Sequence, residues 1–166
     1  DNSFKEIKRL SESHSFISGM RLSRNFGHQA ALVIGLENSQ GHFVAIIDDD
    51  LQDPPEILPG FFEKLYDDVD VVYGIRRKRK EGIIKKFFFG AFYRILRILS
   101  QVKIPLDSGD FCVMKRCVVE AILEFKEINP FLRGIRSYVG FNQVGIEYER
   151  DARLQGESTY TIKKYL

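Results

Sequence analysis

Few of the residues that build disulfide frameworks and soft-metal centres are present in this chain. Among its 166 residues there are no tryptophans, two cysteines, two methionines and three histidines. Two cysteines with no second pair exclude a disulfide framework and a cysteine-rich zinc site, and they fit a reducing compartment. The three histidines belong to no metal-binding constellation. These absences leave oxygen atoms as the ligands for any metal ion.

A long apolar run is also missing. No stretch is long enough to span a bilayer, and no signal peptide is recognisable. The net charge is only +2, so the overall balance of charge favours no particular partner. The length suffices for one domain with a substantial core. Because the chain begins with Asp1 and not with methionine, we expect residues 1–166 to be a single domain from a longer protein.

Alternating helix-type and strand-type patterns predict an α/β layered domain. Helices are expected over residues 4–13, 27–38, 56–66, 85–99, 117–125 and 130–139. Strands are expected over residues 19–23, 43–47, 69–73 and 143–148. The apolar run at 69–73 is typical of a strand buried in a parallel sheet.

The most informative segment is the acidic turn, residues 48–53, which reads Asp-Asp-Asp-Leu-Gln-Asp. It follows an apolar strand, and ligands bind at the carboxyl ends of strands in open α/β sheets. If extended geometry persists, Asp48 and Asp50 converge while Asp49 points elsewhere. Carboxylates placed together repel one another unless a positive charge lies between them. A hard cation such as Mg²⁺ or Mn²⁺, bound with a substrate's phosphates, would provide that charge.

Two other interpretations of the acidic turn stay open at this point. Acidic residues at strand ends are common in loops, and a phospho-accepting acidic pocket also lies at a strand end. An EF-hand is excluded, because Asp53 stands where glycine is needed and Pro59 where glutamate is needed.

Basic and apolar residues dominate the segment after residue 75. Between Arg76 and Arg97 there are nine basic residues and one acidic residue, Glu81. The helix expected at 85–99 is apolar around most of its circumference, as in a buried core helix or a helix lying on a membrane surface. Both interpretations remain. A nucleic-acid surface is not expected, because the aromatic residues are clustered and not spaced to stack on bases.

Six segments follow one another in a consistent order over nearly the whole chain. They lie at residues 22–31, 48–56, 70–76, 108–111, 131–134 and 156–160. Together they resemble the family-2 inverting glycosyltransferases of the GT-A fold. Within that family they are similar to the polyprenyl-phosphate group, such as dolichol-phosphate mannosyltransferases and bactoprenol glucosyltransferases. The resemblance implies a Rossmann-like three-layer α/β sandwich that here lacks its N-terminal strand–helix–strand portion, which helps to hold the nucleotide.

The resemblance also implies roles for individual residues. The metal, Mg²⁺ or Mn²⁺, would be held by Asp48, Asp50 and Gln52. The donor would be bound by Arg24, His28, Asp48 and Asp49. The acceptor phosphate would be bound by Arg76, Arg133 and Ser158. Asp110, in a Gly-Asp-Phe loop, would occupy the position of the catalytic base.

Simpler roles remain for several of these residues. Asp110 after a glycine is also a common turn residue. Because a polyprenyl phosphate is already ionised, Asp110 could orient the acceptor or the sugar hydroxyls and take no proton. Asp53 could cap the helix that follows it. Arg133 and Ser158 are equally compatible with ordinary surface positions.

The function implied by the resemblance is transfer of a sugar, from a UDP-sugar for preference, to a polyprenyl phosphate with inversion. We expect the partners to be the nucleotide-sugar, the lipid acceptor and a membrane surface. The expected location is the cytoplasmic face of the membrane, with the full-length protein anchored there, and a homo-oligomer is compatible with the sequence. The alternatives are a glycosyltransferase with a saccharide acceptor and a non-catalytic binding domain of the same fold.

Overall fold

The computed structural model describes residues 2–50, 52–66, 68–77 and 108–149. In this part of the chain the helices are α1 (Ser3–Ser13), α2 (His28–Glu37), the short 3₁₀ helix η1 (Pro55–Ile57), α3 (Leu58–Lys64), α5 (Arg116–Leu123) and α6 (Leu132–Tyr138). The strands are β1 (Phe43–Ile46), β2 (Val71–Arg76), β3 (Ser108–Lys115) and β4 (Gln143–Tyr148). None of these helices is long and apolar enough to cross a membrane.

The four strands form one mixed sheet in the order β1-β3-β2-β4. Strand β3 is antiparallel to both of its neighbours, with Ile46 opposite Cys112 and Val71 opposite Met114. Strands β2 and β4 are parallel. The antiparallel pairing matters for the site, because it brings the beginning of β3 beside the ends of β1 and β2.

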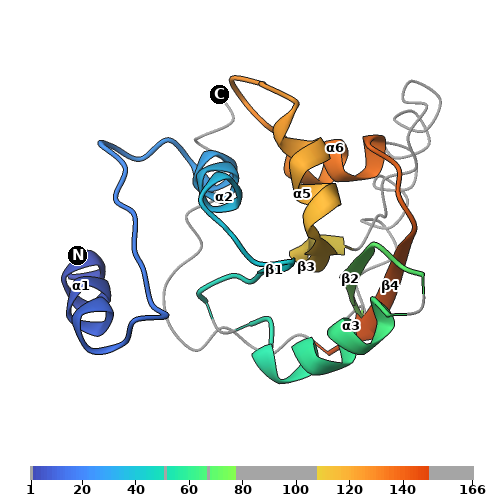
Figure 1. Ribbon diagram of the computed structural model, residues 1–166, viewed down its shortest axis with the longest axis horizontal. Coiled ribbons are helices and arrows are strands. Elements are labelled where there is room, and N and C mark those ends of the chain that lie inside the picture. Colours follow the sequence, from blue (N-terminus) through green and yellow to red (C-terminus); the bar gives the residue numbers. More distant parts are fainter. Residues whose placement is uncertain (1, 51, 67, 78–107, 150–166) are drawn as a thin grey trace, which may run out of the picture.

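Helices cover both faces of this sheet, which makes three layers (Figure 1). On one face α2, α5 and α6 pack on the side chains of Cys112 and Met114. On the other face α3 packs on Phe111 and Val113. The alternation along β3 follows from the extended backbone, which directs successive side chains to opposite faces. The α/β three-layer architecture predicted from the sequence is therefore confirmed.

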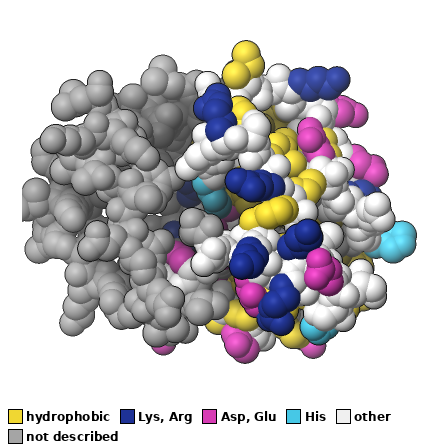
Figure 2. All heavy atoms as spheres, turned by 90° about the vertical axis from the view of Figure 1, so that its left-hand side faces the viewer, with side chains coloured by type: hydrophobic (Ala, Val, Ile, Leu, Met, Phe, Trp, Pro, Cys, Tyr) yellow, Lys and Arg dark blue, Asp and Glu magenta, His cyan; other side chains and the backbone are white. Residues whose placement is uncertain are grey.

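Helix α1 contributes nothing to either core, since none of its residues is buried. On the face of the molecule that Figure 2 presents, basic and acidic side chains are interspersed among hydrophobic ones. The described part of this face thus carries no large patch of a single charge.

Most of the expected elements are present, with boundaries shifted by a few residues. The strand expected at 19–23 is wrong, because this stretch pairs with no strand in the described part of the chain and is mostly exposed. The prediction of a parallel sheet is only partly right, since β2 has one antiparallel and one parallel neighbour. Strand β3 was not anticipated. The helix expected at 85–99 lies outside the described residues.

Candidate active site

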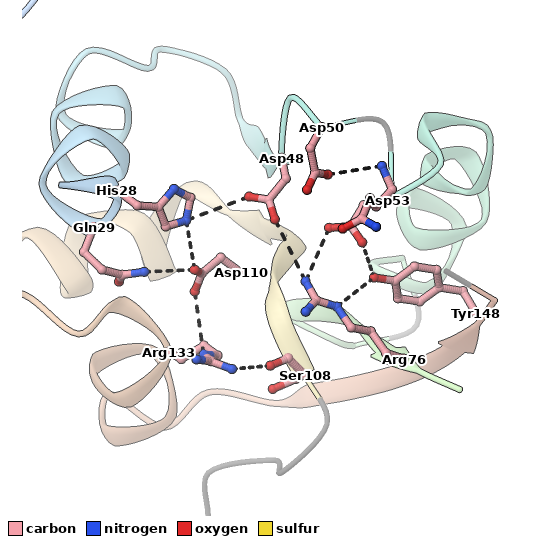
Figure 3. A network of polar contacts seen from close by, with 11 residues as sticks. His28, Gln29, Asp48, Asp50, Asp53, Arg76, Ser108, Asp110, Arg133 and Tyr148 are labelled. Carbon is pink, nitrogen blue, oxygen red and sulfur yellow. Dashed lines mark hydrogen bonds and ion pairs between the residues drawn. The ribbon is translucent and has the colours of Figure 1, made fainter. Parts of the chain in front are cut away.

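Polar side chains from five segments converge at the edge of the sheet where β1 and β2 end and β3 begins (Figure 3). Asp48 follows β1, Arg76 ends β2, and Asp110 lies near the start of β3. Helix α2 contributes its first two residues, and α6 contributes Arg133. The site is thus assembled mainly from residues distant in the sequence.

Asp110 lies on strand β3 and not in a loop, which corrects the sequence-based prediction of its setting. Its Oδ2 accepts hydrogen bonds from Gln29 Nε2 at 2.9 Å and from His28 Nε2 at 3.2 Å. Its Oδ1 lies 3.8 Å from Nε of Arg133. With only 11% of its side chain exposed, Asp110 is a nearly buried carboxylate at the meeting point of α2, β3 and α6.

The start of α2 is shaped by Gly27. This residue is the N-cap and has a φ of +93°, a conformation that glycine adopts without strain. Its backbone N–H donates to the side chain of Asn25 at 2.8 Å. The sharp entry into the helix presents both His28 and Gln29 to Asp110.

Asp48 lies between His28 and Arg76 (Figure 3). On one side Nε2 of His28 is 3.8 Å from Oδ1 of Asp48, and on the other Nη2 of Arg76 is 3.9 Å from its Oδ2. The pKa of Asp48 is raised, first by burial and then by the negative charges of Asp53 and Asp50, against the opposing effect of His28 and Arg76. Additional positive charge at this position would therefore stabilise the ionised form of Asp48.

Asp53 and Tyr148 hold the Arg76 side chain in place. Asp53 has no exposed surface, and its Oδ2 lies 3.7 Å from Nη2 of Arg76. The Tyr148 hydroxyl donates a hydrogen bond to Asp53 and accepts one from Nε of Arg76 at 3.4 Å. A buried carboxylate needs such partners, because an uncompensated charge inside the protein is strongly unfavourable.

Asp53 has a role beyond the capping that the sequence allowed. The N-cap of the following helix η1 is Pro54, and the Asp53 side chain turns inward toward Tyr148. The Pro-Pro pair at 54–55 starts the new helix, and the acidic turn before it folds back over the end of β2.

Whether the site suits a divalent cation depends on Asp48, Asp50 and Gln52. Strand β1 ends at Ile46, so the geometry beyond Asp48 is a turn and not the extended chain expected from the sequence. Oδ1 of Asp50 accepts a hydrogen bond from the Gln52 backbone N–H at 3.2 Å. No group of three or more His, Cys, Asp or Glu side chains in the described residues forms a metal cage. The oxygen donors fit a cation bound as Mg²⁺ usually is, by one or two carboxylates and by substrate phosphates.

Other residues expected at the site are not brought into this network. Arg24 is exposed and stacks on the Phe26 ring, with its guanidinium carbon 4.1 Å from the ring centroid. Asp49 is exposed at the tip of the turn. Ser158 lies outside the described residues. Their proposed roles in donor and acceptor binding stay predictions.

Several residues in the network had no role in the sequence analysis. Gln29 and Tyr148 contact acids that lie 81 and 95 residues away, and no local pattern could reveal such pairs. Arg136 lies outside this network; it is almost fully buried and lies over the Tyr73 ring, with its guanidinium carbon 5.0 Å from the ring centroid. The only local signal was the position of Gln29 directly after His28.

Comparison with known proteins shows which family the chain resembles. The profile of the family described as "Glycosyl transferase family 2" matches residues 1–123. An uncharacterized glycosyltransferase, YkcC, from Bacillus subtilis (strain 168) is 43% identical over 100% of this chain and 52% of its own length.

Two further relatives extend the comparison. An uncharacterized glycosyltransferase, sll0501, from Synechocystis sp. (strain ATCC 27184 / PCC 6803 / Kazusa) is 36% identical over 99% of this chain and 52% of its own length. The bactoprenol glucosyl transferase of Shigella phage SfX is 37% identical over 93% of this chain and 51% of its own length. The chain thus spans about half the length of the curated relatives it matches.

Proposed function

The chain belongs to glycosyl transferase family 2, and from this premise we propose that the full protein transfers a sugar from a nucleotide-sugar to a polyprenyl phosphate. The observation that carries the proposal is the convergence of Asp48, Asp110, Arg76 and Arg133 at one edge of the sheet (Figure 3). Acids that can share a cation with a diphosphate there lie beside arginines that can bind a second phosphate. The similarity to a protein named bactoprenol glucosyl transferase supports a lipid acceptor and a glucosyl donor, for which we propose a UDP-sugar.

The acidic turn would hold the donor. Asp48, Asp50 and Gln52 would bind Mg²⁺ or Mn²⁺ together with the diphosphate, and a bound cation neutralises the charge that develops on such a leaving group. Additional positive charge here would offset the raised pKa of Asp48, which stems from burial and from its acidic neighbours. His28, with 45% of its side chain exposed, would face the donor from the other side.

The two arginines would bind the acceptor phosphate. About a third of each side chain is exposed, 33% for Arg76 and 34% for Arg133. A guanidinium offers several N–H donors in a planar fork that matches phosphate oxygens, so each arginine can keep its acidic partner and still bind an anion.

The reaction would be a single displacement with inversion. An acceptor phosphate oxygen forms a bond to the anomeric carbon while the bond from that carbon to the diphosphate oxygen breaks, and the electron pair leaves with the diphosphate. No proton has to be removed, because the acceptor phosphate is already ionised near neutral pH. Asp110 would therefore orient His28 and the reactants, in keeping with the hydrogen bonds its Oδ2 already accepts.

A transfer assay with the full-length protein tests this proposal. UDP-glucose labelled in the sugar is incubated with Mg²⁺ and either a polyprenyl phosphate in detergent or a soluble saccharide, and the anomeric configuration of the product is read by NMR. We expect label in the lipid fraction with inverted configuration, and loss of most transfer in Asp110→Asn. If only the saccharide is labelled, the acceptor is a saccharide and not the lipid. If a folded protein transfers no sugar from any of a panel of UDP- and GDP-sugars, the enzyme proposal is refuted.

A further inference from the structure

Gln29 links three elements of the site through the two ends of its side-chain amide. Its Nε2 donates to Oδ2 of Asp110 on β3 at 2.9 Å. Its Oε1 accepts the backbone N–H of Leu132, the first residue of α6, at 2.8 Å. Gln29 itself is the second residue of α2 and is partly buried. One side chain thus joins α2, β3 and α6 at the carboxylate of Asp110.

The chemistry of the two contacts fixes the direction of this amide. The backbone N–H of Leu132 can only donate, so it must face the carbonyl oxygen of Gln29. The NH₂ group then points to Asp110, whose ionised carboxylate can only accept. Glutamine is the residue that provides both an acceptor and a donor at this length, whereas glutamate would place two carboxylates against each other.

The remaining contacts of Asp110 hold it less firmly. His28 also donates to Oδ2, but its side chain is 45% exposed and its Nε2 lies close to Asp48 as well. Oδ1 is buried without a hydrogen-bond partner among the described residues, and Arg133 approaches it only to 3.8 Å. The partly buried Gln29 contact is therefore the main restraint on rotation of this carboxylate.

The same bond also places Arg133. Leu132 precedes Arg133 at the start of α6, and Nη1 of Arg133 donates to the carbonyl oxygen of Ser108 on β3. Tying Leu132 to Gln29 therefore fixes this end of α6 against the strand that carries Asp110.

We infer that Gln29 is a positioning residue for transfer, which sets the orientation of Asp110 and the distance between Asp110 and Arg133. This inference rests on the proposed function, since it assigns the orientation of Asp110 a role in the chemical step. It predicts that the donor end of the amide, and not only its acceptor end, is needed for turnover.

The test compares Gln29→Leu with Gln29→Glu in the full-length protein. Gln29→Leu removes both bonds, and we expect kcat to fall about 10- to 100-fold, with the donor KM within about threefold of wild type. Gln29→Glu keeps an acceptor for Leu132 but opposes Asp110, so its kcat should fall at least as far. If Gln29→Glu has the kcat of wild type, Gln29 serves only as the acceptor for the Leu132 N–H at the start of α6, and the inference is wrong.

A matched control comes from Gln143, which bonds the other end of the same helix. Its Nε2 donates to the carbonyl oxygens of Arg136 at 2.8 Å and Gly140 at 2.6 Å, with no contact to Asp110. Gln143→Leu should lower the Tm about as much as Gln29→Leu and leave kcat within about twofold. An equal loss of kcat in both variants would assign the effect to helix packing and overturn the inference.

A double variant shows whether Gln29 acts through Asp110. On the Asp110→Asn background, Gln29→Leu should lower kcat by less than about twofold, because residues acting as a unit are not additive. If the wild type is active and the kcat losses of the two single variants multiply fully in the double variant, the inference is wrong. Failure of the wild type to transfer sugar would instead refute the proposed function, so the two failures are distinguishable.

Discussion

The guanidinium of Arg76 lies directly against the backbone of Gly109. A Cβ built at position 109 would stand 2.6 Å from Nη2 of Arg76 and 3.1 Å from its Cζ. The missing side chain of Gly109 is therefore what lets Arg76 cross the start of β3 toward Asp48 and Asp53. This explains the glycine before Asp110, which the sequence had suggested as part of a turn.

Replacing this glycine is expected to lower activity in a protein that still folds. In Gly109→Ala the flexible end of Arg76 can move aside, so the fold should persist while the arginine leaves its position. We expect kcat/KM to fall about 10- to 100-fold, measured by transfer to polyprenyl phosphate. Gly35→Ala is the matched control, because a Cβ there meets nothing within 4 Å, and it should raise stability by up to about 1 kcal/mol. Wild-type kinetics in Gly109→Ala would show that transfer does not require Arg76 to lie against residue 109.

Arg76 and Arg77 offer a comparison between neighbouring arginines. Arg76→Lys removes the planar fork that contacts Asp48, Asp53 and Tyr148, and we expect the KM for the lipid acceptor to rise about tenfold. Arg77 is 67% exposed and pairs only loosely with Glu147 and Glu149, at 3.9 and 3.7 Å. Surface pairs of this kind contribute little, so Arg77→Lys should leave both kinetic constants unchanged. Equal effects of the two changes would indicate a general requirement for basic charge.

Tyr148→Phe should destabilise the protein through Asp53. The change removes the hydroxyl that donates to a carboxylate with no exposed surface, while the ring can still pack on Phe111, with the ring centroids 5.5 Å apart. We expect the free energy of unfolding to fall by about 1–3 kcal/mol at pH 7, the usual loss when a buried polar group loses its partner. Urea denaturation measures this value, and a loss below a few tenths of a kcal/mol would mean that Asp53 does not depend on Tyr148.

The stability difference between wild type and Tyr148→Phe should also depend on pH. The pKa of Tyr148 is raised to about 12 by burial, by the hydrogen bond to Asp53 and by the negative charge of Asp53, against the opposing effect of Arg76. The pKa in the unfolded chain is about 10. The folded state therefore binds more protons than the unfolded state between pH 10 and 12, and stability falls over that window. The advantage of wild type over Tyr148→Phe should be constant below about pH 9 and shrink above pH 10, and a difference independent of pH up to 12 would contradict the raised pKa.

The helices and most strands in the described part of the chain were predictable because their signals are local. The pattern of β4 at Gln143–Tyr148 matched its observed bounds, and the helix predicted at 27–38 corresponds to α2. Strand β3 was missed because its start, Ser108–Gly109–Asp110, has the composition of a turn, although the apolar run at 111–114 that follows is typical of a buried strand. Its extended form is imposed by the neighbouring strands β1 and β2, which pair with it on both sides.

The site was predictable in its acids and not in the residues that hold them. Asp48 and Asp110 stand in segments whose sequences resemble a known family, so their convergence could be expected. The partners that fix the geometry, Gln29 for Asp110 and Tyr148 for Asp53, act across 81 and 95 residues. Such contacts follow from the packing of α2 on the sheet and from the pairing of β4 with β2, and no spacing in the sequence encodes them.

The most direct test of the account is calorimetric titration of UDP-glucose into the full-length protein with and without Mn²⁺. We expect binding that requires Mn²⁺ and weakens at least about tenfold in Asp48→Asn, while the exposed Glu56→Gln nearby binds as wild type does. That result would place the nucleotide-sugar at the acidic turn. Equal binding by wild type and Asp48→Asn, or binding indifferent to Mn²⁺, would contradict a cation site at Asp48 and with it the proposed arrangement of donor and acceptor.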